Sequence, residues 1–127
     1  MNTRSYFSCF LFATTIALSG CGDDAAQKEM ELFKESVEVS LEAWKKGESA
    51  ESLMSRPTPI EFHDEDWQRK AALVNYEIKQ TYRETDGTAR CAVTLTVKPR
   101  GKAAVPVNVT YQIKFGPTIV IARDPYS

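Results

Sequence analysis

The sequence predicts an α+β fold in which a long N-terminal amphipathic helix packs on a four-stranded antiparallel meander. Apolar residues recur at every third or fourth position up to about Lys46, which is the period of a helix. From about Val74 they alternate with polar residues, which is the period of a strand, and turn sequences divide this part into four segments. Such a sheet has one apolar face, and the long helix has to cover it to form a core.

The long helix is predicted from Asp23 or Asp24 to about Lys46. An aspartate at a helix start accepts free backbone N–H groups and opposes the positive end of the helix dipole. Lys46 followed by Gly47 is typical of a helix end, because the lysine offsets the negative end of the dipole and the glycine permits a left-handed turn. The apolar stripe that should face the sheet consists of Met30, Phe33, Val37, Leu41 and Trp44.

Short elements should connect the helix to the sheet. Ser49 can cap a short helix that Pro57 ends, and residues 60–62 can form a brief extended piece. Three acidic residues, 64–66, then precede a tryptophan, a pattern typical of the first turn of another short helix that runs to about Ala71 or Leu73.

The four strands are separated by recognisable turns. Asp86 and Gly87 predict a hairpin turn after the first strand, residues 99–102 form the next turn, and residues 116–117 form the last. The final strand, residues 118–122, does not alternate, so we expect both of its faces to be covered. The inward-facing side chains of the first strand should be Val74, Tyr76, Ile78 and Tyr82, and those of the third Val105, Val107, Val109, Tyr111, Ile113 and Phe115.

The first twenty residues have the layout of a secretory signal peptide. Arg4 supplies a positive charge, residues 6–18 are mostly apolar, and small residues follow. A membrane-spanning helix needs about 20 apolar residues, so this apolar run is too short to be one. The segment ends in Leu18, Ser19, Gly20 and Cys21.

That ending resembles the lipobox of bacterial lipoproteins. The resemblance implies cleavage before Cys21, attachment of lipid to its thiol and acylation of the new amino terminus. Two or three acyl chains would hold the protein firmly on a membrane of the bacterial cell envelope. Because Gly22 rather than an aspartate follows the cysteine, we expect the outer membrane rather than the inner one. The alternative is an ordinary signal peptide with a cysteine near its cleavage site.

The predicted processing defines three parts of the chain. Residues 1–20 are the signal peptide, residues 21–24 the lipidated N-terminus with a short tether, and residues 25–127 a single domain. The mature chain has 107 residues, with 15 basic and 17 acidic side chains that form no basic cluster with aromatic residues. Nucleic-acid binding therefore has no electrostatic support.

Cys91 is the single cysteine that remains after the signal peptide and the lipidated residue are set aside. A reactive thiol is one interpretation. However, Cys91 alternates in phase with Val93, Leu95 and Val97, which places it on the apolar face of a strand. A buried free cysteine behaves as a small apolar residue, and we expect Cys91 to be part of the core.

Two segments carry further resemblances. Residues 41–53 resemble the first helix and following turn of NTF2-like proteins, in which a curved antiparallel sheet clasps a helix as in the cystatin-like fold. Residues 66–78 resemble a segment of uncharacterised small lipoproteins from environmental bacteria, which implies no activity. The glutamine-valine-glycine hairpin of cystatin-type protease inhibitors is absent from the predicted hairpins.

The sequence does not indicate an enzyme or a cofactor. NTF2-like enzymes use polar residues between helix and sheet, whereas the inward polar groups expected here are Gln80 and the hydroxyls of Tyr76, Tyr82 and Tyr111. These groups do not supply a nucleophile, a base and a group that orients the base.

Candidate binding residues fall into two sets. His63, Asp64 and Asp66 have side chains that can bind a divalent metal, although Asp64 is also the expected cap of a short helix and His63 is then exposed. Trp44 continues the helical stripe and should be part of the core. A contact surface is the alternative to core packing for Trp67, Tyr76, Tyr82 and Tyr111.

These observations favour a membrane-anchored, non-catalytic binding or interaction module of the cell envelope. Its partners would be the membrane, through lipidated Cys21, and an unknown envelope protein or small ligand. One alternative is a small NTF2-like enzyme or a carrier of apolar ligands with a tyrosine-lined cavity. Another is a structural subunit of an envelope assembly, which an exposed apolar patch or an unpaired strand edge would favour.

Overall fold

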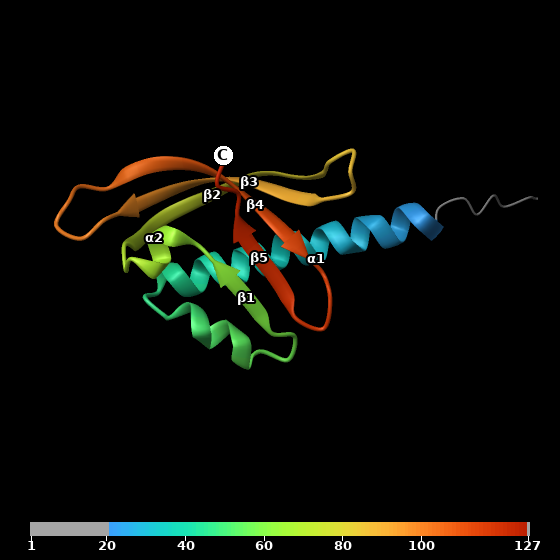
Figure 1. The fold of residues 1–127 in the computed structure, drawn as a ribbon, viewed down its shortest axis with the longest axis horizontal. Helices are drawn as coiled ribbons and strands as arrows, with labels where there is room; N and C mark the ends of the chain where they lie inside the picture. The colour runs from blue at the N-terminus through green and yellow to red at the C-terminus, as the bar shows by residue number, and fades with distance from the viewer. Residues whose placement is uncertain (1–20, 127) are drawn as a thin grey trace, which may run out of the picture.

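The structure, a computed structural model, describes residues 21–126 and has an α+β architecture (Figure 1). A long helix lies along one face of a five-stranded mixed sheet, with short helical segments between them. In chain order the elements are α1 (Cys21–Lys45), the 3-10 helix η1 (Ala50–Ser55), β1 (Ile60–His63), α2 (Glu65–Gln68), β2 (Ala72–Arg83), β3 (Ala89–Lys98), β4 (Val105–Lys114) and β5 (Ile119–Arg123).

The sheet contains one more strand than the predicted antiparallel meander. The order is β1-β5-β4-β3-β2, and β1 pairs with β5 in parallel. The prediction of four antiparallel strands was therefore wrong in the number of strands and in the direction of the pairing between β1 and β5. Residues 60–62 had been expected only as an extended piece, because parallel pairing with a segment much later in the chain leaves no local sequence signal. Pairing of Ile60 with Ile119 and of Phe62 with Ile121 covers the second edge of β5.

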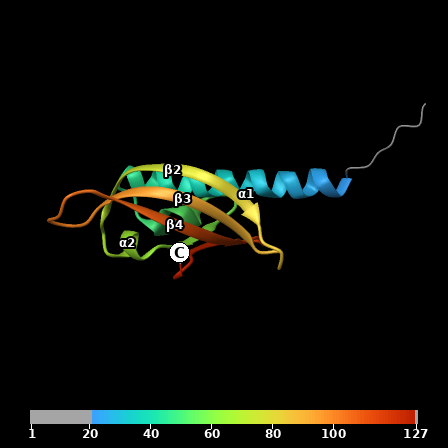
Figure 2. The ribbon, with the colours of Figure 1, turned by 90° about the horizontal axis from the view of Figure 1, so that it is seen from above.

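Helix α1 is amphipathic only along its later part. It begins at Cys21, before the predicted Asp23 or Asp24, and residues 24–28 are exposed. Figure 2 shows these first turns extending past the sheet. The buried stripe begins near Met30 and continues through Phe33 to the end of the helix, where it covers the sheet. Within the described residues, no helix has the length and apolar composition that crossing a membrane requires.

The core lies between α1 and the inner face of the sheet. The predicted burial of Cys91 is confirmed, since its side chain is 0% exposed among the inward residues of β3. Burial raises the pKa of the Cys91 thiol to about 12, so the thiol is protonated at neutral pH and unreactive. Trp44 is also in the core, as expected, at 3% exposure.

Two bulges in β2 change which of its side chains face inward. They fall between Leu73 and Asn75 and between Ile78 and Gln80. Each bulge shifts the alternation of side chains by one residue. The prediction that Val74 and Tyr82 face inward was therefore wrong: Val74 is 47% exposed, and Tyr82 pairs with Arg90 on the outer face. Gln80 likewise pairs with Ala92 on the outer face. On β4, Val105 is 45% exposed because the sheet extends past the helix there.

Candidate functional site

The end of α1 turns sharply and positions Trp44 at the mouth of a pocket. Gly47 has a φ of +84°, which glycine adopts without strain. The Gly47 N–H donates to the Trp44 carbonyl at 2.9 Å, and the Glu48 N–H donates to the Ala43 carbonyl at 2.9 Å. These two bonds form a Schellman motif, which satisfies the last carbonyls of the helix and turns the Glu48 carbonyl back toward α2.

The short helix α2 ends with the same pair of bonds. The Lys70 N–H donates to the Trp67 carbonyl at 2.9 Å, and the Ala71 N–H donates to the Asp66 carbonyl at 3.0 Å. Here the left-handed position is occupied by Lys70, with a φ of 65°, where a side chain costs conformational energy. Trp67 therefore has the same position relative to the end of α2 that Trp44 has relative to the end of α1.

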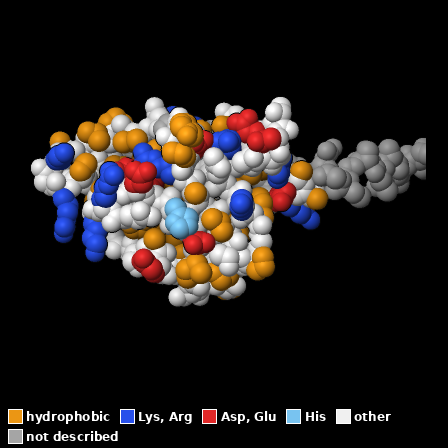
Figure 3. Space-filling model, viewed as in Figure 1, with side chains coloured by type: hydrophobic (Ala, Val, Ile, Leu, Met, Phe, Trp, Pro, Cys, Tyr) orange, Lys and Arg blue, Asp and Glu red, His pale blue; other side chains and the backbone are white. Residues whose placement is uncertain are grey.

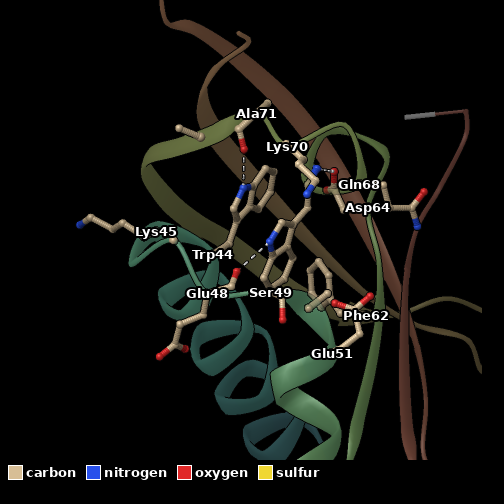
Figure 4. A pocket seen from close by; sticks show the side chains of 14 residues that line it. Trp44, Lys45, Glu48, Ser49, Glu51, Phe62, Asp64, Gln68, Lys70 and Ala71 are labelled. Carbon is tan, nitrogen blue, oxygen red and sulfur yellow. Dashed lines mark hydrogen bonds between the residues drawn. The ribbon is translucent and has the colours of Figure 1, made fainter.

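The two tryptophans join these helix ends reciprocally. Their rings stack with centroids 5.4 Å apart and planes 6° apart. The Trp44 Nε1–H donates to the Ala71 carbonyl at 2.8 Å, and the Trp67 Nε1–H donates to the Glu48 carbonyl at 3.1 Å (Figure 4). Each indole thus bonds to the residue that follows the other helix. Both indole N–H groups are satisfied, which a buried tryptophan requires.

A pocket of about 460 Å³ opens beside this tryptophan pair. Phe62 from β1 packs edge-on against Trp67, with centroids 5.5 Å apart, and forms a further apolar wall. Figure 4 shows the wall residues with charged side chains around them, Lys45 and Glu48 from the end of α1 and Lys70 from the end of α2. The polar residues of the lining are Lys45, Glu48, Ser49, Glu51, Asp64, Gln68 and Lys70.

Asp64, beneath the pocket, is a buried carboxylate at 1% exposure whose two oxygens are both engaged. Its Oδ1 accepts from the Asp66 N–H at 2.8 Å and from the Trp67 N–H at 3.4 Å, so Asp64 is the cap of α2, as predicted. Its Oδ2 accepts from the Tyr111 hydroxyl at 2.6 Å. The Arg123 Nη1 lies 3.4 Å from Asp64 Oδ1 and 2.8 Å from Asp66 Oδ2.

This network strongly perturbs the groups around Asp64. Burial, with the nearby Asp64 charge and the hydrogen bond to it, raises the pKa of the Tyr111 hydroxyl well above its usual value. Burial acts to lower the pKa of the Arg123 guanidinium, but the hydrogen bond to Asp66 and the charge of Asp64 outweigh it and raise that pKa. Tyr111 therefore stays protonated and Arg123 stays charged, as their hydrogen bonds require.

A second groove, of about 700 Å³, runs between α1 and η1. Tyr76 from β2 lines it and donates its hydroxyl to Glu42 Oε1 at 2.8 Å. Burial, with the hydrogen bond to Glu42, raises the pKa of Tyr76 to about 12. The groove is lined by charged side chains of both signs and is more open than the tryptophan pocket, so the pocket is the better defined site.

The four residues considered for a contact surface lie in three different places. Trp67 is buried in the pocket wall at 8% exposure, and Tyr111 is 0% exposed beneath it. Tyr76 lies in the second groove, and Tyr82 lies on the outer face of the sheet. Of these side chains only Trp67 lines the pocket.

The candidate metal ligands are also separated. His63 is exposed, as expected for the capping alternative, and its Nε2 lies 3.3 Å from Glu61 Oε1. Asp64 and Asp66 instead lie around Arg123. Among the side chains that the structure describes, those of residues 24–126, no three of His, Cys, Asp or Glu lie close enough together to hold a metal ion.

The segment predicted to be a lipobox lies mostly outside the described part of the chain. Leu18, Ser19 and Gly20 precede it, and Cys21 is the first residue of α1. Two important residues were not anticipated. Lys70 gave no signal, since lysine is unusual in a left-handed position, and Arg123 is 59 residues away from the carboxylate that it contacts.

Comparison with known proteins adds no relative from which a function could be transferred. No protein family model, no curated protein and no solved structure matches this chain. The functional argument therefore depends on the sequence motif at the N-terminus and on the geometry of the pocket and the surface.

Proposed function

We propose that this chain is a lipid-anchored lipoprotein of the bacterial envelope whose domain is a non-catalytic binding module with an NTF2-like or cystatin-like roll. The observation that carries the proposal is the sequence Leu18, Ser19, Gly20, Cys21 at the end of a short apolar run with a positive start. The order of a long helix followed by antiparallel strands agrees with the roll, and the outer membrane is the proposed location.

The anchor would be connected directly to the domain. Residues 21–24, expected to be a short tether, belong to α1, which continues for 25 residues into the core. A helix does not extend as a flexible linker does, so the domain would stay close to the membrane that holds Cys21.

The tryptophan pocket supports binding rather than chemistry as the role of the domain. Its volume of about 460 Å³ is in the range of small-molecule sites. Three aromatic rings, those of Trp44, Phe62 and Trp67, form part of its wall, and both indole N–H groups already have acceptors. Both oxygens of Asp64 are occupied by donors, so this carboxylate is poorly placed to accept a proton from a substrate. The remaining lining offers contact surface and the charges of Lys45 and Lys70.

Lipid attachment is tested by labelling cells with a radioactive fatty acid. We expect label on the wild-type chain and on Cys91→Val, and none on Cys21→Ser. The Cys91 variant is the matched control, because it removes the other thiol of the described chain, which is fully buried. Label that persists on Cys21→Ser, or an unmodified Cys21 in protein purified from membranes, would contradict the proposal.

Binding in the pocket is tested with the apolar fluorescent probe 1-anilinonaphthalene-8-sulfonate. Ala72 is exposed and lines the pocket, so Ala72→Phe should fill it and abolish saturable binding of the probe. Ala26→Phe adds the same ring at an exposed position on α1 outside the pocket and should leave binding unchanged. Saturable binding that survives Ala72→Phe, or no binding by the wild type, would count against a ligand site here.

A further inference from the structure

The β3–β4 hairpin forms a protruding end of the molecule. The segment from Lys98 to Val105, called the hairpin tip below, extends beyond the end of α1 in two perpendicular views (Figures 1 and 2). It lies at the opposite end of the long axis from the start of α1. All of its residues are exposed except Pro99, which is half-buried. The tip is convex, and none of its residues lines either of the two pockets described above.

The hairpin tip carries three cations within five residues and no acid. Residues 87–123 contain no Asp or Glu at all. The two arginines of this region that lie outside the tip, Arg90 and Arg123, are paired with carboxylates. Lys98, Arg100 and Lys102, in contrast, form no ion pair with any of the residues that the structure describes. Figure 3 shows Lys and Arg side chains gathered at this end of the molecule.

Exposed aliphatic side chains lie beside these cations. Val105 is 45% exposed, and Val74 on the neighbouring edge strand is 47% exposed. Val105 pairs with the inward-facing residue Val97 of β3, whereas Val74 lies on β2, on the other side of β3, and does not face inward. Ala103 and Ala104 add further exposed apolar surface at the tip. The sheet ends here without cover from α1, so these side chains remain in water.

We propose that the hairpin tip docks on the surface of a lipid bilayer that contains anionic lipid. Lys98, Arg100 and Lys102 would contact headgroup phosphates, while Val105 enters the boundary between headgroups and acyl chains. A convex tip with cations around aliphatic side chains fits such a surface, whereas a discrete anion needs a concave site that encloses it. This contact goes beyond the proposed function, since it does not require a lipid on Cys21.

The experiment measures partitioning of the full chain carrying Cys21→Ser onto phosphatidylcholine vesicles that contain phosphatidylglycerol. A cation near an anionic surface strengthens partitioning about 5-fold, so replacing Lys98, Arg100 and Lys102 by Gln should weaken it about 100-fold. The matched control replaces Lys28, Lys34 and Lys114 by Gln, which changes the net charge equally at exposed positions away from the tip. We expect the control to partition like the parent and vesicles of phosphatidylcholine alone to bind neither.

The aliphatic contact is tested separately. Val105→Gln should weaken partitioning about 4-fold, the effect of losing roughly one buried methylene from the interface. Leu32→Gln is its control, because Leu32 is similarly exposed, at 43%, but lies on α1. Equal partitioning of the two triple variants, or of the two single variants, would overturn the proposal. Binding of the tip to a soluble polyanion, with no partitioning of the protein onto anionic vesicles, would also overturn the proposal, since the tip would then be a site for polyanions.

Discussion

Trp44 and Trp67 stack face to face, and each donates its indole N–H to the carbonyl that follows the other's helix. The two helices end in the same Schellman motif, so both carbonyls are turned toward the partner ring. This arrangement connects the end of α1 to the loop that leads into β2. It also forms the wall of the pocket, so the stability of the fold and the shape of the candidate site depend on the same residues.

Replacing either tryptophan by phenylalanine should destabilise the protein and reveal coupling. Trp44→Phe and Trp67→Phe each remove one donor to a backbone carbonyl, and we expect a loss of about 2 kcal/mol in the free energy of unfolding for each. The double variant should lose less than the combined single losses, because both substitutions disturb one stack. Urea unfolding of all four proteins measures this, and simple additivity would show that the two indoles act independently.

The two helix ends should respond in opposite directions to changes at their left-handed residues. Lys70→Gly relieves the strain of a side chain at a φ of 65° and should stabilise the protein by about 1 kcal/mol. Gly47→Ala introduces that strain at a φ of +84° and should destabilise it by about 1 kcal/mol, although the added Cβ meets no atom within 4 Å. Gly116→Ala, where no left-handed φ is required, is the control and should be nearly neutral. Thermal and urea unfolding measure the three changes, and equal signs at positions 47 and 70 would refute the explanation.

The buried network around Asp64 should be sensitive to the loss of any member. Asp64→Asn removes the charge that faces Arg123 and Tyr111 and should cost about 3 kcal/mol. Tyr111→Phe leaves one carboxylate oxygen without its donor and should cost about 2 kcal/mol. Glu65→Gln changes an exposed carboxylate, 3.7 Å from Arg69, and should cost less than about 0.5 kcal/mol. A similar cost for Asp64→Asn and Glu65→Gln in urea unfolding would contradict the role of Asp64 as the centre of the network.

Alkaline pH should destabilise the protein partly through Cys91. The folded state raises the thiol pKa to about 12 from a reference value of 9.0, so the folded state holds the proton more tightly than the unfolded chain does. This contribution is fully present below pH 9 and is lost as the pH rises toward 12. Between pH 7 and 10.5 ionisation of the thiol should lower the free energy of unfolding by about 2 kcal/mol. Over the same range the free energy of unfolding of Cys91→Val should fall by about 2 kcal/mol less than that of the wild type. Urea unfolding at both pH values tests this, and equal losses in the two proteins would show that the thiol does not contribute.

Local patterns predicted the long helix and most of the strands because their signals lie within a few residues. The stripe through Phe33 and Trp44, the alternation around Cys91 and the cap at Asp64 are signals of this kind, and each has the expected role. The bulges were missed because an alternating sequence does not show where β2 carries an extra residue that has no partner in β3. Val74 and Tyr82 were misplaced for that reason.

By itself, the sequence determined the α+β class, the burial of Cys91 and the cap of α2, because hydrophobic period and capping chemistry act over short distances. The resemblance of residues 18–21 to a lipobox is likewise read from the sequence alone, and lipid attachment there is a proposal. Only the tertiary structure decided that β1 joins β5, that Arg123 meets Asp64 and Asp66, and that two indoles cross between helix ends. Those contacts join residues that are distant in the chain, and their energies depend on distance and orientation, which no local pattern specifies.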